Sequence, residues 1–545
     1  MPTLRSYAQA TGLPGVVRLA LVFIFIFIFF LASALTAATQ VAVTTYHYDN
    51  YRTGWNSSET LLTPASVAST SFGLLGTVTV DDQVDAQPLL VPNVNITAGS
   101  HPGKYNVVYV VTGNDTVYAI GAAAGGVLLK QSLGTPVRWP LGCRQNGPNV
   151  GITSTPVIDL ASNTLYVMAY TQDATGPAYR LHALDLGSLT DKVPPQIVTA
   201  SHTLSDGTSF VFKATYERQR PGLLLANGNI YAGFGSFCDM GADVSRGWLL
   251  GWNATSLAPL SANQVLDTQP TSSNTFFLSS IWMSGYGLAA DDSGNVVFAT
   301  GNSDPSGTTY DGISNIQESV VKVSSDLSTV MDLFTPSDES ILDQQDWDLG
   351  AGGVLILPDQ PGTIPHMAVA AGKDGYMYLM NEDHLGGYST SKNNVLGTYE
   401  IGGCLCGESY FVDPKDGAAR VVTSGARNVT LWKLKTSPTP ALTRVSNSPR
   451  IANGQGAGFF TSISSNGKTN AIIWALSRPA SATSKDISLY AFNPDSTGSI
   501  MTQLFQSIAG TWPYFGAHSN LVPIIANGRV YVASYKQLQI FGLKP

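Results

Sequence analysis

The stretch YNVVYVVTGNDTVYAIGAAAGGVLL, residues 105–129, sets the pattern that most of the chain repeats. Its β-branched and aromatic runs favour strands, and the Gly-Asn-Asp between the first two runs is typical of a tight hairpin turn. A corner of small residues at 121–126 then leads into a third strand. The stretch therefore predicts an antiparallel meander with short connections.

Weaker copies of this pattern recur at intervals of roughly 65 residues. Each copy opens with a short apolar strand, and these openings stand near Pro88, Pro156, Pro221, Gly287, Gly353, Ala457 and Leu521. The longer gap between the fifth and sixth of them holds a degenerate extra repeat at 408–434. The pattern thus predicts eight units of about four strands, the last of which lacks one strand.

A single strand at 72–80, FGLLGTVTV, has no partner in its own neighbourhood. If it completes the last unit, the repeats close into a ring that has no open sheet edges. The sequence therefore predicts an all-β fold, an eight-bladed β-propeller over residues 72–545 that this N-terminal strand closes. A tandem of β-sandwiches is the alternative, but it leaves the strand at 72–80 unexplained.

The first 38 residues have the pattern of a signal peptide. Arg5 and Arg18 precede an apolar run at 19–35 that ends in small residues, with cleavage expected after Ala34 or Ala38. The run is long for a signal core and short for a membrane span, so an uncleaved anchor is the alternative. Both predict a secreted or extracytoplasmic chain, with residues 39–71 as an N-terminal extension before the propeller.

The remaining composition fits that compartment. The net charge of −8 argues against a nucleic-acid partner. Sequons for N-glycosylation stand at Asn56, Asn95, Asn253 and Asn428, and a further one, at Asn114, falls in a predicted tight hairpin. In an oxidising compartment the four cysteines predict two disulfides. We expect Cys143 to pair with Cys238, because both lie in loops that lead into or out of neighbouring repeats. Cys404 and Cys406 are separated by one residue, so a bridge between them is expected to be strained.

Several stretches resemble the repeats of pyrroloquinoline-quinone (PQQ) dehydrogenases. The corner phrases at 119–125, 183–188 and 491–498 are similar to that family's repeat, although Leu129 stands where its blade-docking tryptophan would fall. More narrowly, the chain resembles a secreted subfamily of PQQ-like propellers of poorly defined activity. The similar stretches are DNYRTGWN (49–56), GITSTPVID (151–159), YRLHALDL (179–186), RPGLLLANGNIYAGFGSFCD (220–239), 348–362, 370–387 and 526–542.

The resemblance implies that the chain has a quinone site. PQQ is a flat tricarboxylate, so its site needs an aromatic floor, cations, a Ca²⁺ ion and a carboxylate base. Asp346 and Asp348 are the candidate catalytic carboxylates, on the same side of a segment expected to be extended. Asp348 and Asn302, with Ser303 and Asp304 nearby, are the candidate metal ligands. Floor candidates are Trp139, Trp282, Trp347 and Trp512, and the candidate anion clamps are Arg144, Arg220 and Arg427.

Each of these residues also has a structural interpretation. The carboxylates could bind backbone amides in turns, the tryptophans could pack between blades, and the arginines could tie loops together. His47 and His518, which ring closure should bring together, are more typical of structural hydrogen bonds. The sequence also lacks the adjacent cysteines that cover the cofactor in the resembling dehydrogenases. Two functions therefore remain open: a monomeric quinoprotein-type dehydrogenase, and a non-catalytic propeller that binds a small molecule, glycan, peptide or partner protein at its pore.

Overall fold

The computed structural model describes residues 40–123, 125–143, 146–239, 244–270, 279–303, 310–456, 458–495 and 497–545. The predicted signal segment, Arg144 and Asp304 lie outside these ranges. Within them, no helix is both long and apolar enough to cross a membrane.

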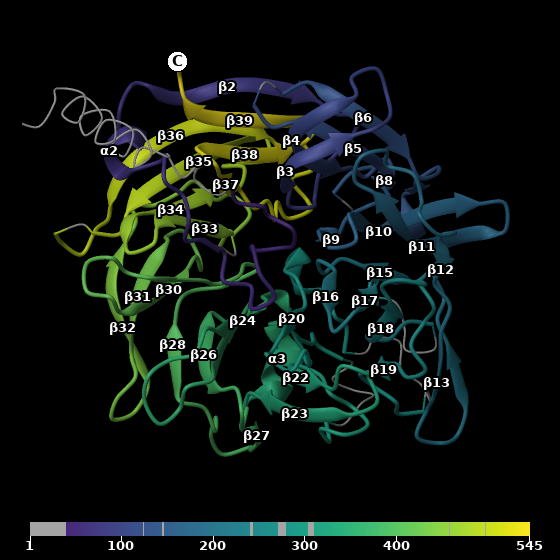
Figure 1. Ribbon diagram of the computed structural model, residues 1–545. Coiled ribbons are helices and arrows are strands. Elements are labelled where there is room, and N and C mark those ends of the chain that lie inside the picture. Colours follow the sequence, from purple (N-terminus) through teal and green to yellow (C-terminus); the bar gives the residue numbers. More distant parts are fainter. Residues whose placement is uncertain are drawn as a thin grey trace, which may run out of the picture. The chain divides into compact units, whose positions relative to one another are not determined.

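Eight antiparallel sheets make up the fold, and each is one blade of a propeller (Figure 1). Blade 1 contains β3 (Leu89–Ile96), β4 (Gly103–Val111), β5 (Thr116–Gly121) and β6 (Val127–Ser132). Blade 2 contains β9 (Val157–Asp159), β10 (Thr164–Asp173), β11 (Gly176–Asp185) and β12 (Gln196–Ile197). Blade 3 contains β15 (Glu217–Gln219), β16 (Leu224–Ala226), β17 (Asn229–Ser236), β18 (Trp248–Asn253) and β19 (Gln264–Val265).

The next three blades follow the same plan. Blade 4 contains β20 (Ala289–Ala290), β21 (Val296–Ala299), β22 (Val320–Val323) and β23 (Val330–Thr335), with β27 (Gly387–Tyr388) at its edge. Blade 5 contains β24 (Val354–Leu357), β25 (Met367–Ala371), β26 (Tyr376–Asn381) and β28 (Gly397–Glu400). Blade 6, built on the degenerate repeat, contains β29 (Ser409–Val412), β30 (Ala419–Thr423), β31 (Thr430–Lys435) and β32 (Ala441–Asn447).

The last two blades recruit strands from the N-terminal part of the chain. Blade 7 contains β33 (Thr461–Asn466), β34 (Thr469–Leu476), β35 (Asp486–Asn493) and β36 (Thr502–Thr511), to which β1 (Trp55–Asn56) adds in parallel. Blade 8 contains β37 (Ile524–Ala526), β38 (Arg529–Ser534), β39 (Gln537–Leu543) and β2 (Phe72–Thr79). Because β2 pairs antiparallel with β39, the predicted ring closure by the N-terminal strand is confirmed.

Short elements in the connections complete the structure. The helices are α2 (Pro64–Val67) and α3 (Glu339–Gln345), with single 3₁₀ turns at η1 (Pro140–Gly142), η2 (Met283–Gly285) and η3 (Leu349–Ala351). Two small hairpins pair β7 (Val137–Arg138) with β8 (Asn149–Val150) and β13 (Ser201–Thr203) with β14 (Ser209–Val211).

Residues 41–58, which we call the axial segment, bind the innermost strand of every blade. Figure 1 shows this segment in dark purple, running into the middle of the ring. Its backbone carbonyls accept hydrogen bonds of 2.7–2.9 Å from blades 1, 2, 4, 5, 6 and 7, and the side-chain amides of Asn50 and Asn56 donate to blades 3 and 8. The partners are Leu90, Ile158, Leu225, Ala290, Ile356, Tyr410, Ile463 and Ile525, in chain order. The predicted N-terminal extension is therefore integrated into the ring.

Arg52 stabilises a turn within the axial segment. Its side chain is fully buried and donates to the Thr45 hydroxyl at 2.7 Å, the Tyr46 carbonyl at 2.9 Å and the Leu288 carbonyl at 2.7 Å. Burial lowers the pKa of Arg52 to about 10. A planar fork of donors suits several carbonyls at once, so this guanidinium satisfies backbone groups that would otherwise be buried without partners.

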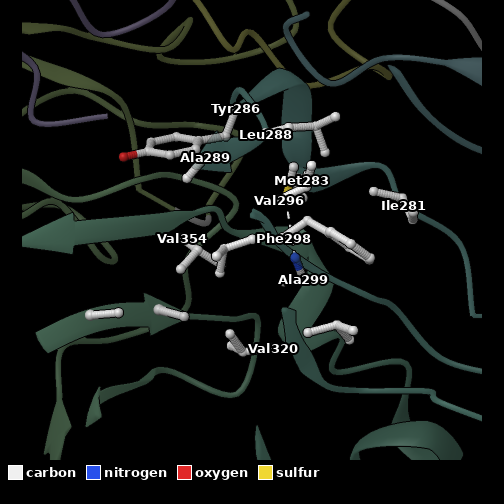
Figure 2. Close-up of a cluster of buried hydrophobic side chains, with 14 of the residues drawn as sticks. Ile281, Met283, Tyr286, Leu288, Ala289, Val296, Phe298, Ala299, Val320 and Val354 are labelled. Carbon is white, nitrogen blue, oxygen red and sulfur yellow. Dashed lines mark hydrogen bonds between the residues drawn. The ribbon is translucent and has the colours of Figure 1, made fainter. Parts of the chain in front are cut away.

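The axial segment packs on an aromatic cluster at the centre of the ring. Tyr46 stacks on His47 with ring centroids 4.5 Å apart, and Tyr286 meets Tyr46 edge-on at 5.0 Å. Figure 2 shows Tyr286 beside the buried apolar side chains between blades 4 and 5, among them Val296, Phe298 and Val354. A Cβ on Gly353 or Gly407 would come within 2.0 Å of the Tyr286 ring, so glycine is required at both positions.

We predict that Arg52→Lys lowers the free energy of unfolding by about 3 kcal/mol, because an ammonium group cannot reach all of these carbonyls. The measurement is guanidinium chloride unfolding followed by tryptophan fluorescence. The matched control is Arg180→Lys, since Arg180 pairs with Asp173 in a partly exposed position. That substitution should change the stability by less than about 1 kcal/mol. Equal effects of the two substitutions would contradict the role given to Arg52.

Glu408 makes the stability of the fold depend on pH. It is fully buried beside this centre, neither of its carboxyl oxygens has a hydrogen-bond partner among the described residues, and burial raises its pKa to about 8. The folded chain therefore keeps a proton that the unfolded chain releases, and stability falls as the pH rises from about 4.5 to about 8.

We expect Glu408→Gln to remove this loss of stability, because its side chain cannot ionise. The difference in free energy of unfolding between the variant and the wild type should be about 2–5 kcal/mol more favourable to the variant at pH 8.5 than at pH 4.5. Unfolding curves across this range measure the gain, and the exposed Glu400→Gln is the control. Parallel pH profiles of wild type and Glu408→Gln would show that Glu408 does not titrate in this range.

Candidate functional site

A cavity of about 320 Å³ opens at the end of the ring opposite the axial segment. Three of its residues lie in the loops that enter innermost strands: Arg220 precedes β16, Trp282 precedes β20 and Asp348 precedes β24. The axial segment instead bonds to later residues of these strands, such as Leu225 and Ile356. Ligands can therefore reach the cavity from one face of the propeller, while the axial segment covers the other.

Four of the candidate site residues from the sequence meet in this cavity. Asp346, Asp348, Arg220 and Trp282 all line it. Asn302 lies directly behind it, where its backbone N–H donates to Asp348 Oδ1 at 2.9 Å. Trp347 does not line the cavity, and its side chain is 46% exposed.

The cavity wall also contains the Cys143–Cys238 disulfide, the pair expected from the sequence. It joins the loop after η1 to the loop after β17 and thus ties blade 3 to the connection between blades 1 and 2. The structure also bridges Cys404 and Cys406, so the expectation that strain would disfavour this pair is wrong. A bend between them brings their Cα atoms to 4.9 Å, which is within the normal range for a disulfide.

Lys373, which the sequence argument did not identify, connects the two candidate carboxylates. Its ammonium lies 2.8 Å from Asp346 Oδ1 and 2.7 Å from Asp348 Oδ2. Burial disfavours the charged ammonium, but the charges of Asp348 and Asp346 outweigh it and raise the pKa of Lys373 above its usual value. Asp348 is buried, with 3% of its side chain exposed, whereas 72% of the Asp346 side chain is exposed.

The backbone at this motif differs from the extended segment that the sequence predicted. Helix α3 ends at Asp346, which has a left-handed conformation with φ of 57°, and Asp348 begins η3. Gly350 then passes so close to Gly301 that a Cβ would come within 2.4 Å of the Gly301 nitrogen. The two carboxylates converge on Lys373 because of this turn, and not because of strand alternation.

Behind Asp348, two buried oxygens have no hydrogen-bond partner among the described residues. They are Asn302 Oδ1 and Glu318 Oε1, while Glu318 Oε2 accepts from the Leu349 N–H at 2.6 Å. Burial, and then the charge of Asp348, raises the pKa of Glu318 well above its usual value. Oxygen-only donors of this kind suit a hard cation such as Ca²⁺. Sequence reasoning missed Glu318, which lies far from both candidate motifs in the chain.

Of the four floor candidates, only Trp282 lines the cavity. The Arg220 guanidinium and the Lys373 ammonium lie 5.6 and 5.4 Å from its ring centroid. Trp512 is buried and donates to the Ala517 carbonyl at 2.8 Å, so it packs within the fold. Trp139 is 48% exposed and lies outside the cavity.

The cavity carries both signs of charge. Arg218, Arg220 and Lys373 line it together with Asp239, Asp346 and Asp348. Burial lowers the pKa of Arg220 to about 9, with the neighbouring Arg218 adding to the shift. Burial, and then Asp348 and Asp346, raises the pKa of Asp239. Sequence reasoning missed Arg218 and Asp239 as well.

The other candidates lie elsewhere. Arg427 is exposed and does not line the cavity. Burial lowers the pKa of His47 to about 3, within the axial segment, and that of His518 to about 4, beside Arg478 and Arg220. Both histidines are therefore neutral near pH 7.

The fold buries one of the predicted glycosylation sites. Asn56 is buried and its side-chain amide donates to the Ile525 carbonyl at 2.9 Å, which leaves no room for a glycan. Asn95 and Asn253 are exposed and Asn428 is partly exposed, so these three positions stay predictions.

Another charged pocket lies in blades 4 and 5. There, ligand atoms of His366, Glu382 and Asp383 lie within 4.8 Å of one another, the one such His and acidic group among the described residues. Lys322 already pairs with Glu382 and with Asp291 in this pocket. His366 pairs with Asp383 at 2.9 Å in the same pocket.

No protein-family model and no curated protein match the chain. Among solved structures, the quinohemoprotein alcohol dehydrogenase from Comamonas testosteroni is 11% identical, covers 94% of this chain and 82% of its own, and has a TM-score of 0.57. A quinohemoprotein alcohol dehydrogenase from Pseudomonas putida is 12% identical over 92% of this chain and 80% of its own, with a TM-score of 0.58. A europium-containing methanol dehydrogenase is 10% identical, covers 92% of this chain and 98% of its own, and has a TM-score of 0.58. At these identities, the similarity shows that the chain shares the eight-bladed propeller fold of these proteins.

Proposed function

We propose that this chain is an extracytoplasmic quinoprotein-type dehydrogenase that binds PQQ and a Ca²⁺-like cation in the cavity beside Trp282. The observation that carries the proposal is the meeting of Trp282, Arg220, Asp346 and Asp348, far apart in sequence, in one cavity. The fold shared with three quinone- or metal-dependent dehydrogenases supports it. The two disulfides support the compartment, because such bonds are typical of oxidising environments.

Each residue has a role that its surroundings suit. Trp282 offers an aromatic surface, and Arg220 offers a cation for a carboxylate of the ligand. Asp348, Asn302 and Glu318 offer oxygens for the cation, and Asp346 is the exposed carboxylate that takes the proton from a substrate hydroxyl. Lys373 forms ion pairs with both aspartates. PQQ, when bound, supplies the acceptor for the two electrons that leave the substrate.

A non-catalytic glycan-binding propeller is the second candidate. Two tryptophans that are nearly half exposed, Trp139 and Trp347, lie a few residues along the chain from the cavity residues Cys143 and Asp348. Exposed aromatic side chains of this kind offer flat apolar surfaces with a polar edge, which suit the faces of sugars.

We predict that the purified chain binds PQQ in the presence of Ca²⁺ and reduces a dye when an alcohol or sugar substrate is added. Eu³⁺ luminescence serves as a second probe of the oxygen ligands. Trp282→Ala should weaken PQQ binding at least tenfold, whereas the matched control Trp139→Ala should leave it unchanged. Asp346→Asn should retain PQQ binding and lose dye reduction by at least a hundredfold.

Two results would reject the dehydrogenase proposal. One is the absence of any PQQ-dependent change in tryptophan fluorescence at high micromolar PQQ with either ion. The other is a loss of PQQ binding in Trp139→Ala that equals the loss in Trp282→Ala. Binding to an oligosaccharide panel that depends on Trp139 and Trp347 would then favour the second candidate.

A further inference from the structure

Arg218 and Arg220 lie side by side on the wall of the cavity. They belong to the sequence ERQRP (217–221), in which Glu217 and Gln219 alternate with the two arginines along β15. Glu217 points into blade 3, where its carboxylate accepts from the Arg246 N–H at 3.1 Å and the Trp248 indole at 3.2 Å. Alternation along a strand therefore sends both arginine side chains to the other side, into the cavity.

Among the described residues, the contacts of the two guanidinium groups are with aromatic rings: Arg218 lies 5.7 Å from the Phe237 ring centroid and Arg220 lies 5.6 Å from that of Trp282. Arg218 Nε and Nη2 are buried without a hydrogen bond, and neither Arg218 nor Arg220 forms an ion pair. Arg218 and Arg220 are partly buried, whereas two fully buried arginines elsewhere in the fold have hydrogen-bond partners. Arg478 donates to the Leu405 carbonyl at 2.7 Å and to Asn520 Oδ1 at 3.2 Å, and Arg52 binds the axial segment.

The carboxylates that attract this pair form no ion pair with it; one of them, Asp239, attracts Arg218 from the cavity wall. Asp85 attracts both arginines from a distance, but its carboxylate accepts from Asn146 Nδ2 at 2.6 Å. Burial raises the pKa of Asp85 to about 6. Two neighbouring guanidinium groups that are partly buried and have no ion pair reduce stability unless something else supplies the negative charge.

We propose that Arg218 and Arg220 form a carboxylate-binding subsite, and that the ligand of this cavity is a small, flat polycarboxylate. Two arginine forks two residues apart on a strand, about 7 Å along the chain, match two carboxylates of one rigid molecule better than a single compact phosphate. Trp282 beside Arg220 supplies a surface for a flat ring. This inference deepens the proposed function, because PQQ is such a ligand, but it requires no quinone and no electron transfer.

The test uses benzene-1,3,5-tricarboxylate, a flat polycarboxylate without a quinone, in calorimetric titrations against the full secreted chain. Its neutral trimethyl ester and inorganic phosphate are the comparison ligands. We expect the tricarboxylate to bind, the ester to show no binding, and phosphate to bind at least tenfold more weakly. Affinity for the tricarboxylate should fall as salt rises from 50 to 300 mM.

Two variants separate a ligand-binding role from a structural one. Arg218→Gln and Arg220→Gln should each weaken tricarboxylate binding by about 10–100-fold, yet raise the melting temperature of the ligand-free protein, because each removes a partly buried charge that has no ion pair. The exposed Arg427→Gln is the matched control and should change neither quantity. Arginines that only tie loops together would instead lower the melting temperature on substitution.

The outcomes distinguish this inference from the proposed function. If the tricarboxylate binds through both arginines and PQQ gives no dye reduction, the subsite stands and the dehydrogenase proposal fails. If the folded wild-type chain does not bind the tricarboxylate, or binds phosphate equally well, the carboxylate subsite is wrong. A lower melting temperature in both variants would also overturn it.

Discussion

The ring depends on how the axial segment satisfies the inner edges of eight sheets. The innermost strand of each blade has backbone groups that no neighbouring strand can pair, and these groups are buried at the centre. Residues 41–58 pass once around the axis and bond to the eight blades in chain order, with Arg52 fixing the turn that makes this path possible. The segment therefore covers one end of the channel, and the candidate site lies at the other end.

Repetition made the fold predictable from sequence. The hairpin pattern at 105–129, its recurrences and the unpaired strand at 72–80 were enough to derive eight blades and their closure, because strand alternation and turn chemistry are local signals. The axial segment was not predictable in the same way. Its residues contact strands hundreds of positions away through backbone groups, which leave little trace in a residue pattern.

The site was predictable in part for the same reason. Asp346, Asp348, Arg220 and Trp282 stand out as polar or aromatic residues in loops that enter innermost strands, and propeller geometry brings such loops together. Lys373, Glu318 and Arg218 were missed because each lies in or within two residues of an ordinary-looking strand. Their importance follows from three-dimensional facts: two short ion pairs, an unpartnered carboxyl oxygen and two unpaired guanidinium groups.

The charges of the cavity are arranged unequally. On the blade 5 side, Lys373 forms ion pairs with Asp346 and Asp348, whereas on the blade 3 side neither Arg218 nor Arg220 forms an ion pair. A ligand with negative charge near blade 3 would complete this arrangement. A structure determined after soaking with PQQ and Ca²⁺ tests this directly. The account predicts a flat ligand against Trp282 with carboxylates on Arg218 and Arg220 and a cation beside Asp348. Density elsewhere on the propeller, or an empty cavity at saturating ligand, would contradict it.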